Sequence, residues 1–131
     1  MDTITREIKL GTIGELLVQL RLLQYNVQAA SALKDSGNYL IAKRDRAFRA
    51  IEVKTTKTPF FEKNGVSNYF HILAIVKLEG EEDQVYLDRS KIYLIPKECV
   101  QEVPSSLHGI QDFAISEELV ESLFDENQWV L

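Results

Sequence analysis

Apolar side chains recur every three or four positions between residues 6 and 25, the spacing that gathers them on one face of an α-helix. We therefore expect an amphipathic helix over this range, with its apolar stripe turned toward a core. The expected stripe consists of Leu10, Ile13, Leu16, Leu17, Leu20 and Leu23.

The residues at the two ends of this segment suit the ends of a helix. Thr3 and Thr5 are candidate N-caps, because a threonine hydroxyl accepts a hydrogen bond from a free backbone N–H of the first turn. Asn26 favours the left-handed backbone conformation that commonly ends a helix. Gly11 and Gly14 each cost about 1 kcal/mol relative to alanine inside a helix, which indicates close approach of another group or a later start.

Shorter runs after residue 26 alternate between apolar and polar positions or are continuously apolar, both of which are typical of β-strands. A tight turn at 44–46 predicts a hairpin, and 60–68 reads as a loop. Ser116 is expected to cap a last helix of about ten residues that opens with Glu117 and Glu118. The predicted strands cover 27–33, 38–43, 47–56, 69–78, 85–87 and 92–95.

The order of these elements predicts a single domain that spans residues 1–131. A helix precedes three strands, a loop, further strands and a final helix, which favours an α/β or α+β class with a mixed sheet and helices packed on it. A chain of 131 residues is long enough for one core and short for two.

Composition narrows the classes of protein. The chain is 45% hydrophobic and 27% charged, as in soluble globular proteins, and no apolar run approaches the ~20 residues of a membrane span. The N-terminus lacks the layout of a secretory signal, and the single Cys99 suits a reducing cytoplasm. Neither His71 nor His108 has the sequence spacing to Cys99 that is typical of a zinc site, so we expect no zinc site. We expect an intracellular, cytoplasmic protein without a membrane segment.

Charge is unevenly distributed along the chain, although the net charge is −5. Residues 34–63 carry eight basic and four acidic side chains, whereas residues 79–131 carry three basic and thirteen acidic ones. A local basic surface can bind phosphates whatever the net charge, and the alternative is an ordinary mixed surface.

Glu52 and Lys54 lie two residues apart in the predicted strand 47–56, so their side chains project from the same face. A carboxylate that binds a hard divalent cation, beside an ammonium that orients a water, is half of a metal-dependent phosphodiesterase site. The alternative is a solvated Glu/Lys pair on a strand whose other face packs on the core.

Three further motifs flank this strand at an informative order and spacing. A glycine precedes an acid in the first helix, at Gly14 and Glu15. An apolar run opens the second strand at 39–42, and Thr55 and Thr56 follow the Glu-x-Lys motif. A Tyr-Leu-Ile-Pro sequence occupies 93–96.

Together these motifs, over about residues 8–98, resemble the PD-(D/E)XK nuclease superfamily, and in particular its small members, the Holliday-junction-resolvase-like and homing-endonuclease-like proteins. The resemblance implies a restriction-endonuclease-like core. It also implies Mg²⁺- or Mn²⁺-dependent endonuclease activity on duplex or branched DNA, with Lys54 positioning the attacking water. Because cutting both strands requires two sites, a homodimer or higher homo-oligomer is expected. The implied metal ligands are Glu52, the carbonyl of Val53, Glu15, and Asn38 or Asp35; the implied phosphate contacts are Lys43, Arg44, Arg46, Arg49, Lys57 and Lys63.

One position departs from the family pattern. We align Asn38 with the acid of the second strand, and an amide lacks the charge that a hard cation prefers. The natural protein is then weak or inactive, or Asp35 supplies the ligand, or Asn38 is an engineered replacement. For Asp35 the alternative is a turn residue. The rival functional class is a catalytically inactive nuclease-fold module that binds DNA or a protein partner.

Overall fold

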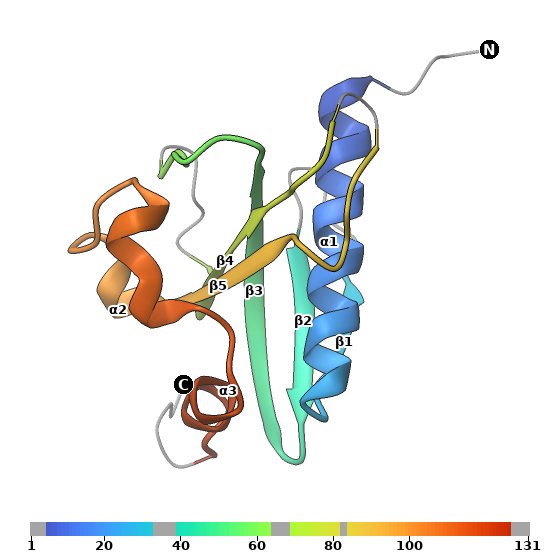
Figure 1. Ribbon diagram of the computed structural model, residues 1–131. Helices are drawn as coiled ribbons and strands as arrows, with labels where there is room; N and C mark the ends of the chain where they lie inside the picture. Colours follow the sequence, from blue (N-terminus) through green and yellow to red (C-terminus); the bar gives the residue numbers. More distant parts are fainter. Residues whose placement is uncertain (1–4, 33–38, 64–68, 82–83, 127–131) are drawn as a thin grey trace.

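The computed structural model describes residues 5–32, 39–63, 69–81 and 84–126, with the backbone alone for residues 6 and 7. Within these ranges, a five-stranded sheet is flanked by helices, which confirms a mixed α+β architecture (Figure 1). The elements are α1 (Arg6–Gln24), β1 (Gln28–Ser31), β2 (Tyr39–Arg44), β3 (Ala47–Thr56), β4 (Ile72–Lys77), β5 (Lys91–Pro96), α2 (Lys97–Val100), the 3₁₀ helix η1 (Leu107–Phe113) and α3 (Glu117–Leu123).

The strands lie in the sheet in chain order, β1-β2-β3-β4-β5. β3 and β4 pair in parallel, and the other neighbours pair antiparallel. The turn at 45 and 46 closes the β2–β3 hairpin, as predicted, and Asp45 adopts a left-handed φ of 55° there. Because β3 is longer than β2, its last four residues extend beyond the hairpin and keep β4 as their pairing neighbour.

Each face of the sheet has its own apolar core, because strand side chains alternate between the faces. Ile51 and Val53 join the core on the side of α1, together with Leu22 of that helix. Leu73 and Tyr93 belong to the core on the other side, which Ile110 of η1 helps to cover. Residues 52 and 54 of β3 therefore lie on the face turned away from α1.

The ends of α1 agree with the prediction from the sequence, whereas the residues buried along it differ from the predicted stripe. The Thr5 hydroxyl accepts from the backbone N–H of Ile8, and Asn26 has a φ of 65°. However, Leu20 and Leu23 are 50% and 60% exposed, and Val18 and Leu22 are buried in their place. Leucines occupy both sides of this helix, so periodicity did not decide which side faces the sheet.

The second half of the chain contains further differences. Residues 84–86 have no regular secondary structure and 87–89 form a turn, where a strand was predicted over 85–87. Helix α3 has 7 residues where about ten were expected. The two helical segments α2 and η1 were not predicted, since each is too short to show helical periodicity. No described helix is long and apolar enough to cross a membrane.

Candidate functional site

Glu52 and Lys54 lie where β3 passes the end of β2. Glu52 is the last residue of β3 that pairs with β2, and Lys54 lies two residues beyond it. Burial differs between the two: Glu52 is 8% exposed, whereas Lys54 is half-buried. A carboxylate at the edge of a core thus lies next to a cation that reaches toward solvent, on one face of one strand.

Strand register places Tyr39 directly opposite Glu52. The Tyr39 side chain is buried, and its hydroxyl donates a hydrogen bond to the carbonyl oxygen of Tyr69. The second-strand position that faces Glu52 in this register is therefore aromatic. Asp35 and Asn38, the two expected second-strand ligands, lie outside the described residues.

Glu15 approaches the same end of the sheet from α1. Its Oε1 accepts a hydrogen bond from the Ser31 hydroxyl at 2.8 Å, at the last residue of β1. Ser31 pairs with Leu40, whose side chain belongs to the α1 core, so this contact lies on the helix side of the sheet. Glu15 and Glu52 consequently share one end of the sheet but project from its two faces.

The oxygen donors at this end have the right chemistry for a hard cation but are few. Glu52 supplies a carboxylate, and the buried side chain of Val53 points into the α1 core, which leaves its backbone carbonyl as the donor. Among the described residues, no group of three histidine, cysteine, aspartate or glutamate side chains could hold a metal ion. The remaining ligands of the expected site fall on positions 35 and 38.

Arg49 does not lie on the surface, which corrects its prediction as a phosphate contact. The residue is 4% exposed, and its guanidinium donates to the carbonyl oxygens of Leu123 at 2.9 Å and Asp125 at 2.7 Å. Burial lowers the pKa of Arg49, and the charge of Asp125 acts in the opposite direction. These hydrogen bonds connect strand β3 to the end of α3.

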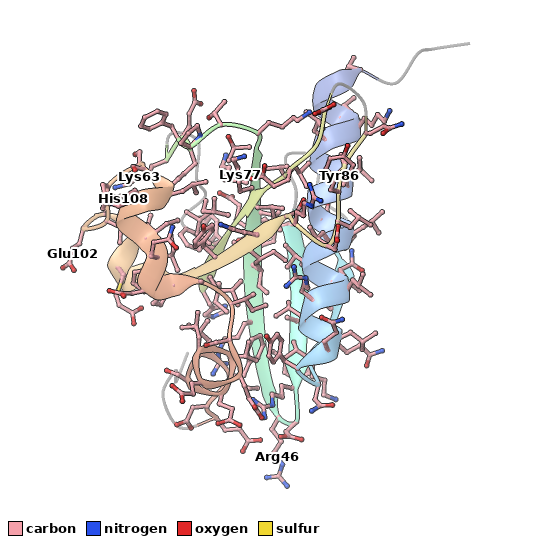
Figure 2. All side chains as sticks on the ribbon, viewed as in Figure 1. Arg46, Lys63, Lys77, Tyr86, Glu102 and His108 are labelled. Carbon is pink, nitrogen blue, oxygen red and sulfur yellow. The ribbon has the colours of Figure 1, made fainter. Side chains whose placement is uncertain are left out.

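The other predicted phosphate contacts divide between the two ends of β3. Lys43, Arg44 and Arg46 lie at the hairpin, about 25 Å from Lys54 for eight residues of strand. Lys63 lies near the other end, where its ammonium donates to the carbonyl oxygen of Val103, and Figure 2 shows it far from Arg46. The basic segment of the sequence therefore does not form one continuous surface.

Two acidic residues of the C-terminal segment lie at the hairpin. Arg44 lies 3.9 Å from a carboxylate oxygen of Glu121, and the backbone N–H of Arg46 donates to Glu126. Lys43 lies 5.4 Å from the centre of the Phe48 ring. Two stretches of opposite charge that are far apart in sequence thus come together at this end.

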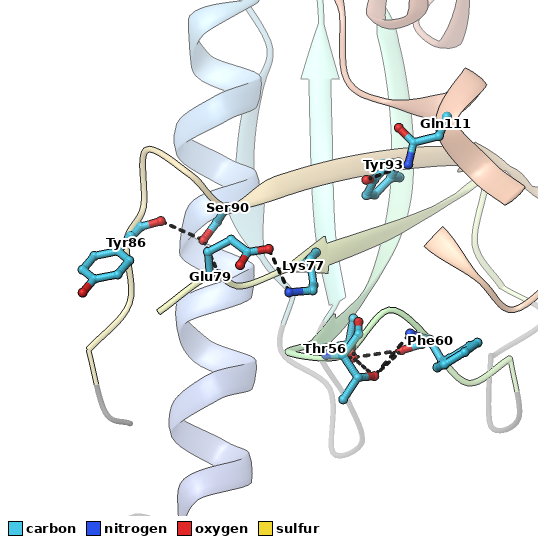
Figure 3. A network of polar contacts seen from close by, with 9 residues as sticks. Thr56, Phe60, Lys77, Glu79, Tyr86, Ser90, Tyr93 and Gln111 are labelled. Carbon is cyan, nitrogen blue, oxygen red and sulfur yellow. Dashed lines mark hydrogen bonds and ion pairs between the residues drawn. The ribbon is translucent and has the colours of Figure 1, made fainter. Parts of the chain in front are cut away.

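Two lysines that the sequence did not single out lie on the same face of the sheet as Lys54. Thr56 pairs with Lys77, and Lys77 pairs with Lys91, so all three share the face that carries Lys54. Lys77 forms an ion pair with Glu79 at 2.8 Å (Figure 3), whereas Lys91 is exposed. No local pattern marks these lysines, because their proximity depends on pairing between strands.

Two titratable groups nearby have altered pKa values. Burial lowers the pKa of His71, assisted by the charges of Arg49 and Lys97, and its Nδ1 accepts a hydrogen bond from the backbone N–H of Ala50 at 2.8 Å. Burial, with the charges of Glu98 and Glu102, raises the pKa of the Cys99 thiol, which disfavours the thiolate that nucleophilic chemistry needs.

Comparison with protein-family models, curated proteins and solved structures finds no match to this chain.

Proposed function

We propose that this protein is a metal-dependent DNA endonuclease that hydrolyses phosphodiester bonds. The proposal rests on the pair formed by Glu52 and Lys54. Both side chains lie on one face of β3, at the point where this strand extends beyond the end of β2. Glu15, which lies at the same end of the sheet, adds a second carboxylate.

The arrangement of elements supports the same proposal. A helix, an antiparallel three-stranded meander and a fourth strand parallel to the third follow one another in the order expected for a restriction-endonuclease-like core. The Glu-x-Lys strand occupies the centre of the five described strands, where it is held by neighbours on both sides.

Each residue has a distinct part in this proposal. Glu52, the carbonyl of Val53 and a ligand from Asn38 or Asp35 would hold Mg²⁺ or Mn²⁺. Glu15 would join this set only by giving up its hydrogen bond to Ser31 on the other face of the sheet. The bound cation would supply charge neutralisation at the phosphate and a more acidic water. Lys54 is about 7 Å from Glu52 along the strand, and its ammonium would orient the attacking water and offset charge that develops on the phosphorane oxygens.

One such site per chain would cut one strand at a time. We therefore include a homodimer or higher homo-oligomer in the proposal. The apolar side of α3 packs on its own sheet through Val120 and Leu123, so its acidic side is the part that a second subunit would meet. Val130 and Leu131, also candidates for the interface, lie outside the described residues.

A second candidate function is a catalytically inactive module that binds DNA or a protein partner. The position of Tyr39 favours it, because the residue paired with Glu52 across the strands is a buried aromatic side chain, which offers no carboxylate to a cation. Lysine and arginine side chains can bind DNA phosphates without a metal ion.

The deciding experiment is cleavage of plasmid, linear and four-way-junction DNA in Mg²⁺ and in Mn²⁺. The protein is compared with Asn38→Asp and with Asn38→Asp combined with Lys54→Ala. We expect cleavage to appear or rise in the single variant and to vanish in the double variant. Cleavage by the unaltered protein would assign the missing ligand to Asp35 or Glu15.

Thermal unfolding with and without Mg²⁺ separates the two candidate functions. A cation that binds the folded state raises the melting temperature by mass action, and Glu52→Gln should abolish that rise. If none of the three proteins cleaves DNA and Mg²⁺ does not change the melting temperature, the endonuclease would be excluded and the binding module would remain.

A further inference from the structure

A cavity of about 270 Å³ lies at the edge of β5, between α1 and η1. Its apolar floor includes Ile92 and Ile115. Arg21 and Lys91 bring two cations to its wall, and the described residues that line it include no carboxylate. In a chain of net charge −5, a cavity with this lining favours an anion.

The polar groups of the cavity are held in place by the fold. Arg21 Nη2 donates to the carbonyl oxygen of Ser90 at 3.0 Å, which fixes the guanidinium beside the start of β5. The Gln111 amide donates to the carbonyl oxygen of Leu107 at 2.9 Å and to the Tyr93 hydroxyl at 3.4 Å. Because that hydroxyl accepts from Gln111 (Figure 3), its own hydrogen can be donated to a ligand.

Lys91 of the cavity wall lies on the same face of the sheet as Lys54. Lys54, Ile75 and Tyr93 lie in one row across three strands, and Lys91 lies two residues from Tyr93. The Cα atoms of Lys54 and Lys91 are therefore about 12 Å apart, from two strand spacings and two residues of strand. A strand of B-DNA carries one phosphate per about 3.4 Å of helix axis, so this span corresponds to three or four nucleotides.

We propose that the cavity formed by Arg21, Lys91, Tyr93 and Gln111 binds a phosphodiester group of a DNA strand, three or four nucleotides from the bond held at Lys54. This inference depends on DNA being the substrate in the proposed function. It gives the DNA a direction over Thr56 and Lys77 to Lys91, away from the hairpin cations, because the neighbouring row through Ile75 and Tyr93 is buried. Lys77 is engaged by Glu79, so Lys91 supplies the solvent-exposed charge of the path.

The test is equilibrium binding of a labelled 20-nucleotide DNA, single-stranded and duplex, followed by fluorescence anisotropy at several salt concentrations in EDTA. EDTA removes divalent cations, so the result does not depend on cleavage or on metal binding. Lys91→Gln is compared with Lys43→Gln, which removes the same charge from an exposed lysine at the hairpin. Both side chains are exposed, so neither change should unfold the protein.

We expect Lys91→Gln to weaken binding at least about threefold and to lower the salt slope by about 0.9 on duplex DNA, the loss of one phosphate contact. Lys43→Gln should change both quantities less. Equal effects of the two substitutions, or no binding by the unaltered protein, would overturn the inference. Binding of inorganic phosphate without binding of DNA would overturn the choice of ligand. If no protein cleaves DNA in the Mg²⁺ and Mn²⁺ assay but Lys91→Gln still weakens DNA binding, the nuclease would be refuted and a DNA-binding site at this cavity would remain.

Discussion

Burial gives Arg49 a structural role that its sequence context does not suggest. It lies among basic residues, yet its guanidinium is occupied by backbone carbonyl oxygens of Phe48, Leu123 and Asp125. The Phe124 ring lies 5.9 Å from the same guanidinium. A buried charge is tolerated where hydrogen bonds replace its hydration, so Arg49 stabilises the contact between the hairpin and α3.

His71 makes stability depend on pH. Its pKa in the folded protein lies below the ordinary value of 6.5, chiefly because of burial, and its Nδ1 accepts from Ala50. As pH falls through 6.5, the unfolded chain binds a proton that the folded chain resists, so the free energy of unfolding decreases until the folded pKa is passed. Above 6.5 this contribution to stability is complete.

Urea unfolding between pH 7.5 and 5.5 measures this dependence, in a range above the usual carboxylate pKa values. We expect the free energy of unfolding to fall toward pH 5.5 and the fall to diminish in His71→Asn, which keeps an acceptor without titrating. His108→Gln, at an exposed position, serves as the control. An unchanged pH dependence in His71→Asn would contradict the assignment.

At the scale of elements, the close contact between α1 and β3 determines how the helix lies on the sheet. A Cβ atom built on Gly14 would lie 1.9 Å from the Oγ1 of Thr55. Thr55 is the neighbour of Lys54, and its hydroxyl is buried with no hydrogen-bond partner among the described residues, so it serves packing here rather than phosphate binding. The glycine therefore brings the helix within van der Waals distance of the Glu-x-Lys strand.

Gly14→Ala tests this contact. Alanine would ordinarily stabilise a helix interior by about 1 kcal/mol, but here we expect a loss of about 1–3 kcal/mol from overpacking against β3. Thr55→Ala removes the nearest atom, so the loss should shrink in the double variant. Urea unfolding of the four proteins completes the cycle, with Thr12→Ala as an exposed control on the same helix. Additive effects of the two substitutions would show that the residues do not compete for space.

Across the whole molecule, folding brings together charges that the sequence keeps apart. Glu121 of the acidic C-terminal third lies 3.9 Å from the Arg44 guanidinium, and Glu126 accepts a hydrogen bond from the backbone N–H of Arg46. At the other end of the sheet, Lys91 is exposed and Lys54 is partly exposed, and Lys77 is paired with Glu79. The net charge of −5 therefore does not oppose DNA binding evenly over the surface.

Neutralising the acids should expose the hairpin cations. We expect Glu121→Gln combined with Glu126→Gln to raise the affinity for duplex DNA at low salt by a few fold and to steepen the salt dependence. Stability should change by less than about 1 kcal/mol, because the Arg44–Glu121 ion pair is partly exposed and glutamine at position 126 keeps an oxygen that accepts from the backbone N–H of Arg46. Glu117→Gln combined with Glu118→Gln removes the same charge from the first turn of α3 and serves as the control. Equal affinity gains in both pairs would point to a general charge effect.

The sequence by itself determined those features that depend on neighbours along the chain. Strand β3 was predicted over its observed residues, and the N-cap at Thr5, the stop at Asn26 and the hairpin turn were also confirmed. Alternation along one strand likewise sufficed to place Glu52 and Lys54 on a common face. Each of these features is fixed by local backbone geometry or by a period of two.

The tertiary structure decided what depends on contacts between distant residues. Pairing register placed Tyr39 opposite Glu52 and brought Lys77 and Lys91 to the side of Lys54, and neither result follows from spacing within a segment. Which leucines of α1 are buried was decided by packing on the sheet, because apolar residues lie on both sides of that helix. The role of Arg49 was decided by Leu123 at the end of α3, which lies 74 residues further along the chain. Burial and strand register arise when separate segments meet, and for that reason a local pattern does not encode them.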